Sequence, residues 1–264
     1  MPRILVVNDD GIASEGTALL ARVLQALGEV TVVAPDGDRS GMSHSISAHQ
    51  AVRAQAVPDG DLRRFACSGT PADCVLLGVN ELCGGRPDIV VSGINRGANL
   101  ADDVNYSGTV AAAVEASIVG IPAIAVSLVS SWPKLDRVHH WDVAATVALQ
   151  LAEDVLREPL PRGTYWNVNV PNLPELRGVR FTRQGRKQYA ERLARVEDDG
   201  DAGGNGDGSA STAYYWVWDM SHLGGGDDTD TVAVDAGYAS ITPLQIDRTD
   251  EATLQRYAAR ATKG

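Results

Sequence analysis

Short apolar runs alternate with amphipathic stretches through the first two thirds of the chain, and each run ends in a polar loop. A continuous run of strand-forming residues is typical of a strand buried on both faces, as in a parallel sheet. The amphipathic stretches repeat their apolar residues at the spacing of one helix face. The predicted strands span 4–7, 30–34, 87–92, 121–127 and 165–171, and the predicted helices span 16–27, 110–118 and 141–156. This alternation predicts an α/β fold whose successive loops lie at one edge of a parallel sheet.

Two weaker patterns lie between these elements. Residues 47–66 alternate loosely around a Pro-Asp-Gly-Asp turn signal at 58–61, which predicts a β-hairpin. A further helix is predicted to begin at Pro71, because Thr70 is a favourable N-cap and Asp73 lies in the first turn.

The pattern changes after about residue 174. Residues 179–189 form a basic strand-like segment and residues 213–218 an aromatic one, and we expect them to pair as a long protruding hairpin. Between them, residues 197–211 are rich in Asp, Gly, Ser and Asn, with too few apolar groups to offset the entropy of ordering, which predicts a mobile insertion. An exposed aromatic hairpin indicates an oligomer contact.

A strand at 237–243 and a terminal helix at 251–261 complete the predicted elements. We therefore expect two parts that form one structural unit. Residues 1–174 make the core that carries the chemistry, and residues 175–264 supply the hairpin, the returning strand and the terminal helix used in oligomerisation.

Composition narrows the function. The chain has 264 residues and a formal net charge of −11 at pH 7, which argues against binding nucleic acid or an anionic membrane through a broad basic surface. Three cysteines without a Cys-x-x-Cys pair favour neither a disulfide framework nor a zinc ribbon. The sequence shows no leader pattern and no run of about 20 apolar residues, so it predicts a cytoplasmic protein.

Two adjacent carboxylates, Asp9 and Asp10, follow the first predicted strand, between Asn8 and Gly11. Like charges this close raise each other's pKa unless a cation neutralises them, and hard cations such as Mg²⁺ or Mn²⁺ prefer oxygen ligands. An acidic turn accounts for the same four residues, because Asn, Asp and Gly are common turn formers. A dinucleotide-binding loop is disfavoured, because its first glycines are replaced by acids that repel phosphate.

Oxygen-bearing side chains also follow two other predicted strands. Ser40 lies in the loop after residues 30–34, and Asn95 in the loop after residues 87–92. Chemistry at the carboxyl ends of strands is usually assembled from several loops. Independent turns would not require this coincidence, so the three loops together predict a site for a hard metal ion.

Hydroxyl groups mark the start of another predicted helix. Ser107, Gly108 and Thr109 precede the apolar residues of the helix at 110–118. Exposed N–H groups and the positive end of the helix dipole favour an anion there, which predicts a phosphate cradle. Simple capping of the helix by Ser107 or Thr109 explains the same residues.

Several short motifs occur in one order along the chain. They are NDDG at 8–11, APD at 34–36 with RSG at 39–41, GTPADC at 69–74, SGINRGAN at 92–99, SGT at 107–109 and GYASITP at 237–243. This series resembles the SurE family of survival-protein nucleotidases from Arg3 to about Pro243. The insertion at 197–211 is longer than that resemblance leads us to expect, and Tyr106 stands where histidine is common.

The resemblance implies a three-layer, Rossmann-like core with a mostly parallel sheet, and a C-terminal hairpin exchanged between the subunits of a homodimer or homotetramer. It implies a metal-dependent phosphomonoesterase that hydrolyses nucleoside 5′- and 3′-monophosphates. A phosphatase for another small phosphoester or short polyphosphate would share these motifs. So would a nucleotide-binding regulator that does not hydrolyse its ligand.

The resemblance also implies roles for individual residues. One divalent ion per subunit, Mg²⁺ or Mn²⁺, would be held by Asp9, Asp10, Ser40 and Asn95. From the chemistry of these residues we further predict that Asp9 and Asp10 are catalytic, because one of the two carboxylates would orient or deprotonate the attacking water. The residues expected to bind the phosphate are Asn99, Ser107, Gly108 and Thr109.

Overall fold

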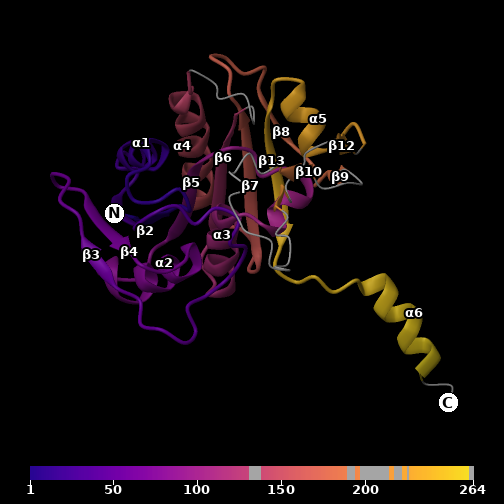
Figure 1. The fold of residues 1–264 in the computed structure, drawn as a ribbon, viewed down its shortest axis with the longest axis horizontal. Helices are drawn as coiled ribbons and strands as arrows, with labels where there is room; N and C mark the ends of the chain where they lie inside the picture. The colour runs from indigo at the N-terminus through magenta and orange to yellow at the C-terminus, as the bar shows by residue number, and fades with distance from the viewer. Residues whose placement is uncertain (131–137, 189–193, 197–213, 217–221, 225, 262–264) are drawn as a thin grey trace, which may run out of the picture.

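The computed structural model describes residues 1–130, 138–188, 194–196, 214–216, 222–224 and 226–261. Among these residues, nine strands form one sheet in the order β3-β4-β2-β1-β5-β6-β7-β13-β8 (Figure 1). The strands are β1 (Arg3–Val7), β2 (Glu29–Pro35), β3 (Ala54–Ala56), β4 (Arg63–Cys67), β5 (Ile89–Arg96), β6 (Ala123–Val129), β7 (Thr164–Pro171), β8 (Val179–Phe181) and β13 (Ala239–Gln245). Only β3–β4 and β7–β13 pair in antiparallel fashion within this described sheet. The α/β fold with a mostly parallel sheet is therefore confirmed.

Helices cover both faces of the sheet. The α-helices in the described part of the chain are α1 (Glu15–Leu24), α2 (Pro71–Leu77), α3 (Gly108–Ile118), α4 (Trp141–Arg157), α5 (Asp230–Asp235) and α6 (Glu251–Ala261). A π-helical segment, η1 (Gly78–Leu82), continues α2, and a 3-10 segment, η2 (Ala101–Asn105), precedes α3. Helices α1 and α4 pack on one face, and α2 and α3 pack on the other (Figure 1). This arrangement confirms the three layers.

The first strand shows how the sequence pattern builds this core. Ile4 and Val6 are buried against the α1 and α4 layer, whereas Leu5 and Val7 are buried against the α2 and α3 layer. Successive side chains of a strand point to opposite faces. The unbroken apolar run of β1 thus contributes to two separate hydrophobic clusters.

The predicted local signals are found where expected. Thr70 and Asp73 form a capping box at the start of α2, in which Thr70 Oγ1 accepts the Asp73 N–H at 3.2 Å and Asp73 Oδ2 accepts the Thr70 N–H at 2.8 Å. The β-hairpin expected within residues 47–66 is confirmed as the antiparallel pair β3–β4.

The strand order places the ends of β1, β2 and β5 next to one another. Strand β1 pairs in parallel with β2 on one side and with β5 on the other. After β1 the chain adds β2 on one side, and it later adds β5 on the opposite side of β1. The direction in which strands are added to the sheet therefore reverses at β1. Open α/β sheets bind ligands outside the carboxyl ends of strands at such a switch point.

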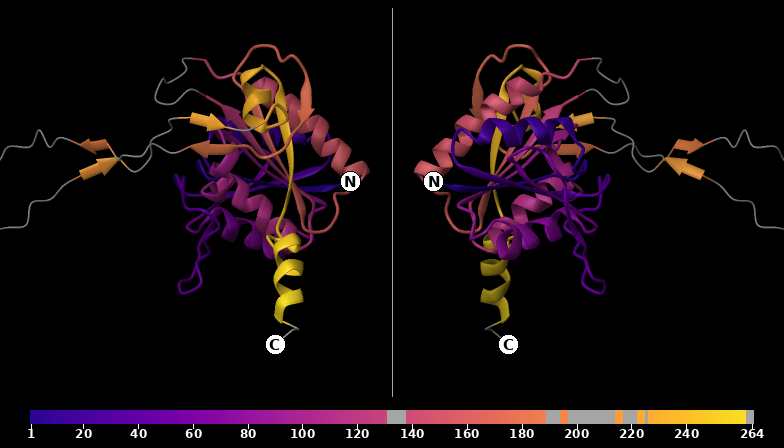
Figure 2. Two further views of the ribbon diagram at one scale, coloured as in Figure 1. Left: turned by 90° about the vertical axis from the view of Figure 1, so that its right-hand side faces the viewer. Right: turned by 90° about the vertical axis from the view of Figure 1, so that its left-hand side faces the viewer.

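The C-terminal hairpin is present, but its first arm begins later than predicted. Strand β9 (Arg186–Gln188) pairs with β12 (His222–Gly224), and β10 (Ala194–Val196) pairs with β11 (Tyr214–Trp216). Both pairs continue one antiparallel register, and the hairpin projects from the body of the molecule (Figure 2). The predicted pairing of residues 179–189 with residues 213–218 is wrong. Strand β8 pairs with β13 in the main sheet, β9 pairs with β12, and the aromatic segment β11 pairs with β10. The insertion predicted to be mobile, 197–211, lies outside the described residues.

A buried carboxylate fastens the base of this hairpin to the core. Asp230 accepts the N–H groups of Ala101 at 2.9 Å, Gly185 at 2.8 Å and Thr231 at 2.8 Å. These bonds connect three segments to one carboxylate: η2 through Ala101, the start of the hairpin through Gly185, and α5 through Thr231. Residues on both sides of the predicted boundary at 174 therefore contribute to the same sheet and to the hydrogen bonds of Asp230. The boundary itself stays a prediction.

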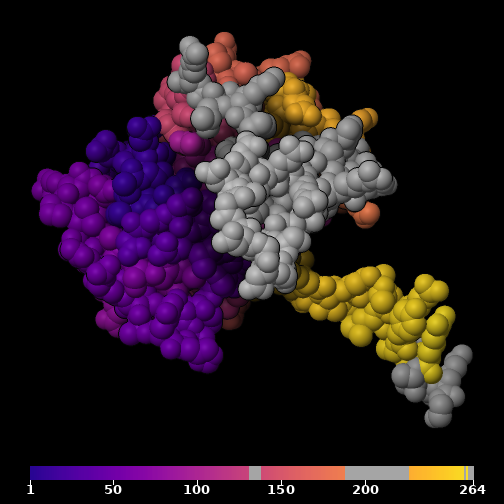
Figure 3. All heavy atoms as spheres, viewed as in Figure 1, coloured from indigo at the N-terminus to yellow at the C-terminus, as the bar shows by residue number. Residues whose placement is uncertain are grey.

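The terminal helix α6 stands away from the rest of the chain (Figures 1 and 3). Its described side chains at 251–258 and 260 are all exposed. In the described part of the chain, we find no helix with the length and apolar character needed to cross a bilayer.

Candidate functional site

The site begins in the turn after β1, which Asn8 holds in place. Asn8 is fully buried, and its Nδ2 donates to the Gly11 carbonyl at 2.9 Å and to Thr17 Oγ1 at 2.7 Å. Gly11 has a φ of +98°, which a residue with a side chain rarely adopts. The turn interpretation of these residues is thus correct, and the turn presents Asp9 and Asp10 at the edge of the sheet.

Asp9 lies against the N-terminus of α3. It is 4% exposed, and its Oδ1 accepts a hydrogen bond from the Thr109 hydroxyl. A Cβ built on Gly108 would lie 2.7 Å from Asp9 Cβ, so a larger residue at 108 would displace one of these segments. The start of α3 and the end of β1 therefore form one closely packed unit.

Burial disfavours the charged form of both carboxylates. It raises the pKa of Asp9, although the Thr109 hydrogen bond opposes this shift. Burial and the charge of Asp9 raise the pKa of Asp10 to about 6, and the Arg96 N–H, which donates to Asp10 Oδ2 at 3.1 Å, opposes that shift. A nearby divalent cation would favour the charged form of both groups.

The second loop reaches this turn through its backbone. The Arg39 N–H donates to the Asp9 carbonyl at 2.8 Å. The next residue, Ser40, donates to Asp38 Oδ1 through its N–H at 2.8 Å and through its hydroxyl at 2.5 Å. The hydroxyl oxygen of Ser40 keeps lone pairs for a ligand, because its contact with Asp38 uses its proton.

Asp38 is a residue that the sequence interpretation missed. Its charge contributes to the raised pKa of Asp9 and Asp10, behind the larger effect of burial. The signal in the sequence is its place, two residues before Ser40 in a loop at the functional edge of the sheet. That loop also contains Asp36, and the sequence pattern does not distinguish the two acids.

The third group of candidates lies at the end of β5 and in the loop that follows it. Strand β5 extends to Arg96, so Asn95 lies within the strand and not in a loop as predicted, and Asn99 lies in the loop after it. Asn95 is buried, and its Nδ2 donates to the Gly97 carbonyl at 2.9 Å, which leaves its Oδ1 as a possible ligand. The neighbouring Arg96 N–H reaches Asp10. Asn95 therefore lies next to a residue in direct contact with the carboxylate pair.

Asn99 is held by a buried polar network across β6 and β7. Its Nδ2 donates to Ser127 Oγ at 2.7 Å, and its N–H donates to Asn169 Oδ1 at 2.9 Å. Its carbonyl accepts Asn167 Nδ2 at 2.8 Å and Asn169 Nδ2 at 3.0 Å. The sequence interpretation missed Asn167 and Asn169, although two Asn residues at alternate positions of a buried strand are a signal that polar partners face them.

The remaining predicted phosphate-binding residues gather at the start of α3. Ser107 caps the helix, because its Oγ accepts the Val110 N–H at 3.1 Å. Thr109 bonds to Asp9 and Gly108 packs on it. The capping explanation is thus correct for Ser107, and the positive end of the helix dipole faces the carboxylate turn. Asn99 is placed by the separate network described above.

The donor groups fit a hard metal ion. Asp9 and Asp10 offer carboxylate oxygens, Ser40 a hydroxyl oxygen and Asn95 an amide oxygen, which is the oxygen-only set that Mg²⁺ and Mn²⁺ prefer. Within the described ranges, no group of three His, Cys, Asp or Glu side chains is arranged to hold an ion. An ion bound at Asp9 and Asp10 would therefore use neutral oxygens as well.

Comparison with known proteins identifies the family. A family profile described as "Survival protein SurE" matches residues 4–191. The 5′/3′-nucleotidase SurE of Cronobacter sakazakii is 46% identical over 250 residues, which cover 94% of this chain and 91% of that protein. The 5′-nucleotidase SurE of Pelobacter propionicus is 44% identical over 255 residues, covering 96% of each protein. The crystal structure of the SurE protein from Aquifex aeolicus matches with a TM-score of 0.78 and 37% identity, over 97% of this chain and 98% of that one. The chain therefore belongs to the SurE family.

Proposed function

We propose that this protein is a metal-dependent phosphomonoesterase that hydrolyses nucleoside 5′- and 3′-monophosphates to nucleoside and phosphate. The observation that carries the proposal is the adjacent pair Asp9 and Asp10, of which Asp9 is buried against the N-terminus of α3 and Asp10 is half-buried beside it. The names of its relatives, 5′/3′-nucleotidase and 5′-nucleotidase, support the substrate class.

Asp9, Asp10, Ser40 and Asn95 would hold one divalent ion, Mg²⁺ or Mn²⁺, in each subunit. When bound, such an ion polarises a phosphoryl oxygen and lowers the pKa of a coordinated water. Support for this assignment comes from the oxygen-only donor set and from the burial that raises the pKa of both carboxylates.

The protein's own groups would orient the reactants. Thr109 holds the Asp9 carboxylate in one orientation through its hydroxyl. The N–H groups at the start of α3, with Ser107, Gly108 and Thr109, would face the phosphate oxygens as negative charge shifts between them. Asp10 is the more accessible of the two carboxylates, and we assign to it the acceptance of a hydrogen bond from the attacking water. Asn99 would approach the phosphate from the loop after β5.

Phosphate release from AMP in Mn²⁺ buffer tests this function. Asp9→Asn and Asp10→Asn should each lower turnover by about 100-fold or more, because a carboxylate ligand becomes a neutral amide. The matched control is Asp61→Asn, which changes an exposed carboxylate in the loop between β3 and β4. Chelation of metal should abolish turnover by the unaltered enzyme, and added Mn²⁺ or Mg²⁺ should restore it.

Near-normal turnover by both folded Asp variants would contradict the proposed site. Tight binding of AMP without phosphate release would indicate a regulator. A panel that adds other phosphoesters and short polyphosphate separates a nucleotidase from a phosphatase of different specificity.

We also propose that the protein acts as a homodimer or homotetramer in the cytoplasm. An isolated helix of 11 residues is marginal in water, and the exposed side chains of α6 gain packing partners only from another surface. The three cysteines, which are buried and free, are consistent with a reducing compartment.

A further inference from the structure

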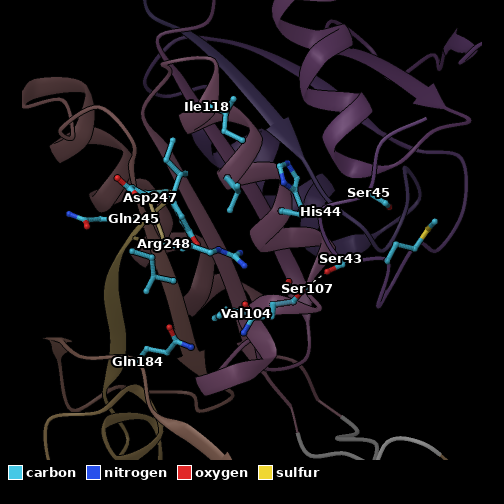
Figure 4. Close-up of a pocket in the computed structure, with 17 residues that line it drawn as sticks. Ser43, His44, Ser45, Val104, Ser107, Ile118, Gln184, Gln245, Asp247 and Arg248 are labelled. Atoms are coloured by element: carbon cyan, nitrogen blue, oxygen red, sulfur yellow. Dashed lines mark hydrogen bonds between the residues drawn. The ribbon is translucent and has the colours of Figure 1, made fainter. Parts of the chain in front are cut away.

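A cleft of about 930 Å³ opens beside Ser107 and follows α3 (Figure 4). Residues 42–45 line one side of it and residues 244–248 line the other. Ile118 lies at the top of the labelled region in Figure 4 and Ser107 lies well below it, and the eleven residues of α-helix from Gly108 to Ile118 span about 16 Å. The cleft is therefore continuous with the end of α3 that we assign to phosphate binding, and it is longer than a phosphate group requires.

The lining of the cleft combines an apolar floor with a polar rim. Ala111, Val114 and Ile118 come from α3, while His44 and Arg248 belong to the two sides. Ligand sites for small molecules typically have apolar walls and a few polar groups that fix orientation. A purine or pyrimidine base, which has apolar faces and a polar edge, matches this distribution.

His44 occupies a fixed position on the wall of the cleft. Its Nε2 lies 2.8 Å from Glu115 Oε2, and the two side chains are 32% and 10% exposed. The preceding residue, Ser43, bonds to the end of η2, just before α3. Its N–H donates to the Tyr106 carbonyl at 3.0 Å, and its hydroxyl donates to the Asn105 carbonyl. The loop that carries His44 is therefore attached to α3 through Glu115 and to the segment that leads into α3 through Ser43.

The position of His44 and Glu115 along α3 suits the base of a nucleotide, which is the part farthest from its phosphate. Glu115 is eight residues beyond Ser107, about 12 Å along the helix. With Nε2 engaged by Glu115, the Nδ1 atom of His44 has no hydrogen-bond partner among the residues that the structure describes. A ring with one nitrogen held and the other free can exchange a hydrogen bond with the edge of a base.

We propose that this cleft is the nucleoside subsite, and that His44, held by Glu115, contacts the base of a nucleoside monophosphate. The inference rests on the proposed function, because it places the phosphate of the same substrate at the start of α3. Ser107 belongs both to that end of α3 and to the cleft lining, and this continuity argues for the nucleoside part of the substrate as the occupant. A second copy of the chain is the competing occupant.

The test compares two substrates that share a phosphate but differ in the leaving group. AMP has a nucleoside, whereas p-nitrophenyl phosphate has neither ribose nor base. His44→Ala should raise the KM for AMP about tenfold, which corresponds to ~1.4 kcal/mol and to the loss of one hydrogen bond. Its kcat for AMP and both constants for p-nitrophenyl phosphate should stay within about twofold. The control is His49→Ala, because His49 is an exposed histidine near His44 that does not line the cleft.

Each outcome decides between specific alternatives. Equal changes of KM for both substrates, or no change for either, would overturn the subsite while leaving the proposed function in place. A change in molecular mass by light scattering without a selective change in KM would assign the cleft to a subunit contact and also overturn it. Failure of the unaltered enzyme to hydrolyse both substrates in Mn²⁺ buffer would overturn the proposed function and the subsite together.

Discussion

The carboxylate of Asp9 depends on one hydroxyl group for its orientation. Thr109 is fully buried at the start of α3, and its Oγ1 is the donor to Asp9 Oδ1. Loss of the donor would leave a buried carboxylate oxygen without this partner, which typically costs about 1–3 kcal/mol. At the residue scale, the orientation of the Asp9 carboxylate is therefore set by a contact between positions that are 100 residues apart.

We expect Thr109→Val to lower kcat for AMP by about tenfold or more, because valine keeps the shape of threonine and removes the hydroxyl. Thr109→Ser, which keeps the hydroxyl, should recover most of the activity. Steady-state phosphate release measures both variants, and thermal unfolding shows whether each is folded. Equal activity of the valine and serine variants would show that the hydroxyl does not position Asp9.

Helix α3 and strand β1 approach each other closely, and Gly108 makes this possible. Its missing side chain leaves room for Asp9, whose Cβ would be 2.7 Å from an added Cβ. The buried network from β6 and β7 holds Asn99 in the adjacent loop. At the scale of elements, the site is a junction of a strand end, a helix start and a loop that leaves no room for a larger residue at position 108.

We expect Gly108→Ala to lower kcat by about tenfold or more through displacement of Asp9 or of α3. Gly108 does not have a positive φ, and alanine is a better helix former than glycine, so backbone strain would not explain a loss. Phosphate release and the apparent affinity for Mn²⁺ are the measurements. Unchanged values for both would contradict the close contact.

Helix α6 has an apolar stripe that the described chain leaves exposed. Leu254 is 53% exposed and Tyr257 is 54% exposed, and they lie three positions apart on one face of the helix. The hairpin projects from the body in another direction (Figure 2). At the scale of the whole molecule, we propose that these projections contact further copies of the chain.

We expect Leu254→Asp combined with Tyr257→Asp to reduce the molecular mass measured by light scattering to that of a smaller species, because charged groups would enter an apolar contact. The matched control is Gln255→Ala, which lies off this stripe of α6. A mass equal to that of the unaltered protein would contradict a role for α6 in assembly.

The local elements were predictable because their signals lie close together in the sequence. The capping box at Thr70 and Asp73 and the apolar run of β1 need only near neighbours or a burial pattern. The hairpin was harder to predict, since residues 179–189 contain two strand segments that pair with different partners. Strand composition does not specify a partner that is far away in the chain.

The sequence by itself determined the α/β class, the order of most elements, and the loops that carry Asp9 and Ser40, whereas Asn95, which it placed in a loop, lies near the end of β5. It could do so because periodicity and turn chemistry are local, and because parallel strands bring successive loops to one edge. Only the tertiary structure decided that Thr109 donates to Asp9, that Asp38 holds Ser40, that Asn169 holds Asn99, and that His44 meets Glu115 beside a cleft. Each of the Thr109, Asn169 and His44 contacts joins residues at least 70 positions apart, and the Asp38 contact, although local, depends on a loop conformation that composition does not specify. The chemistry of these pairs follows from packing, which places distant groups within hydrogen-bond distance of one another.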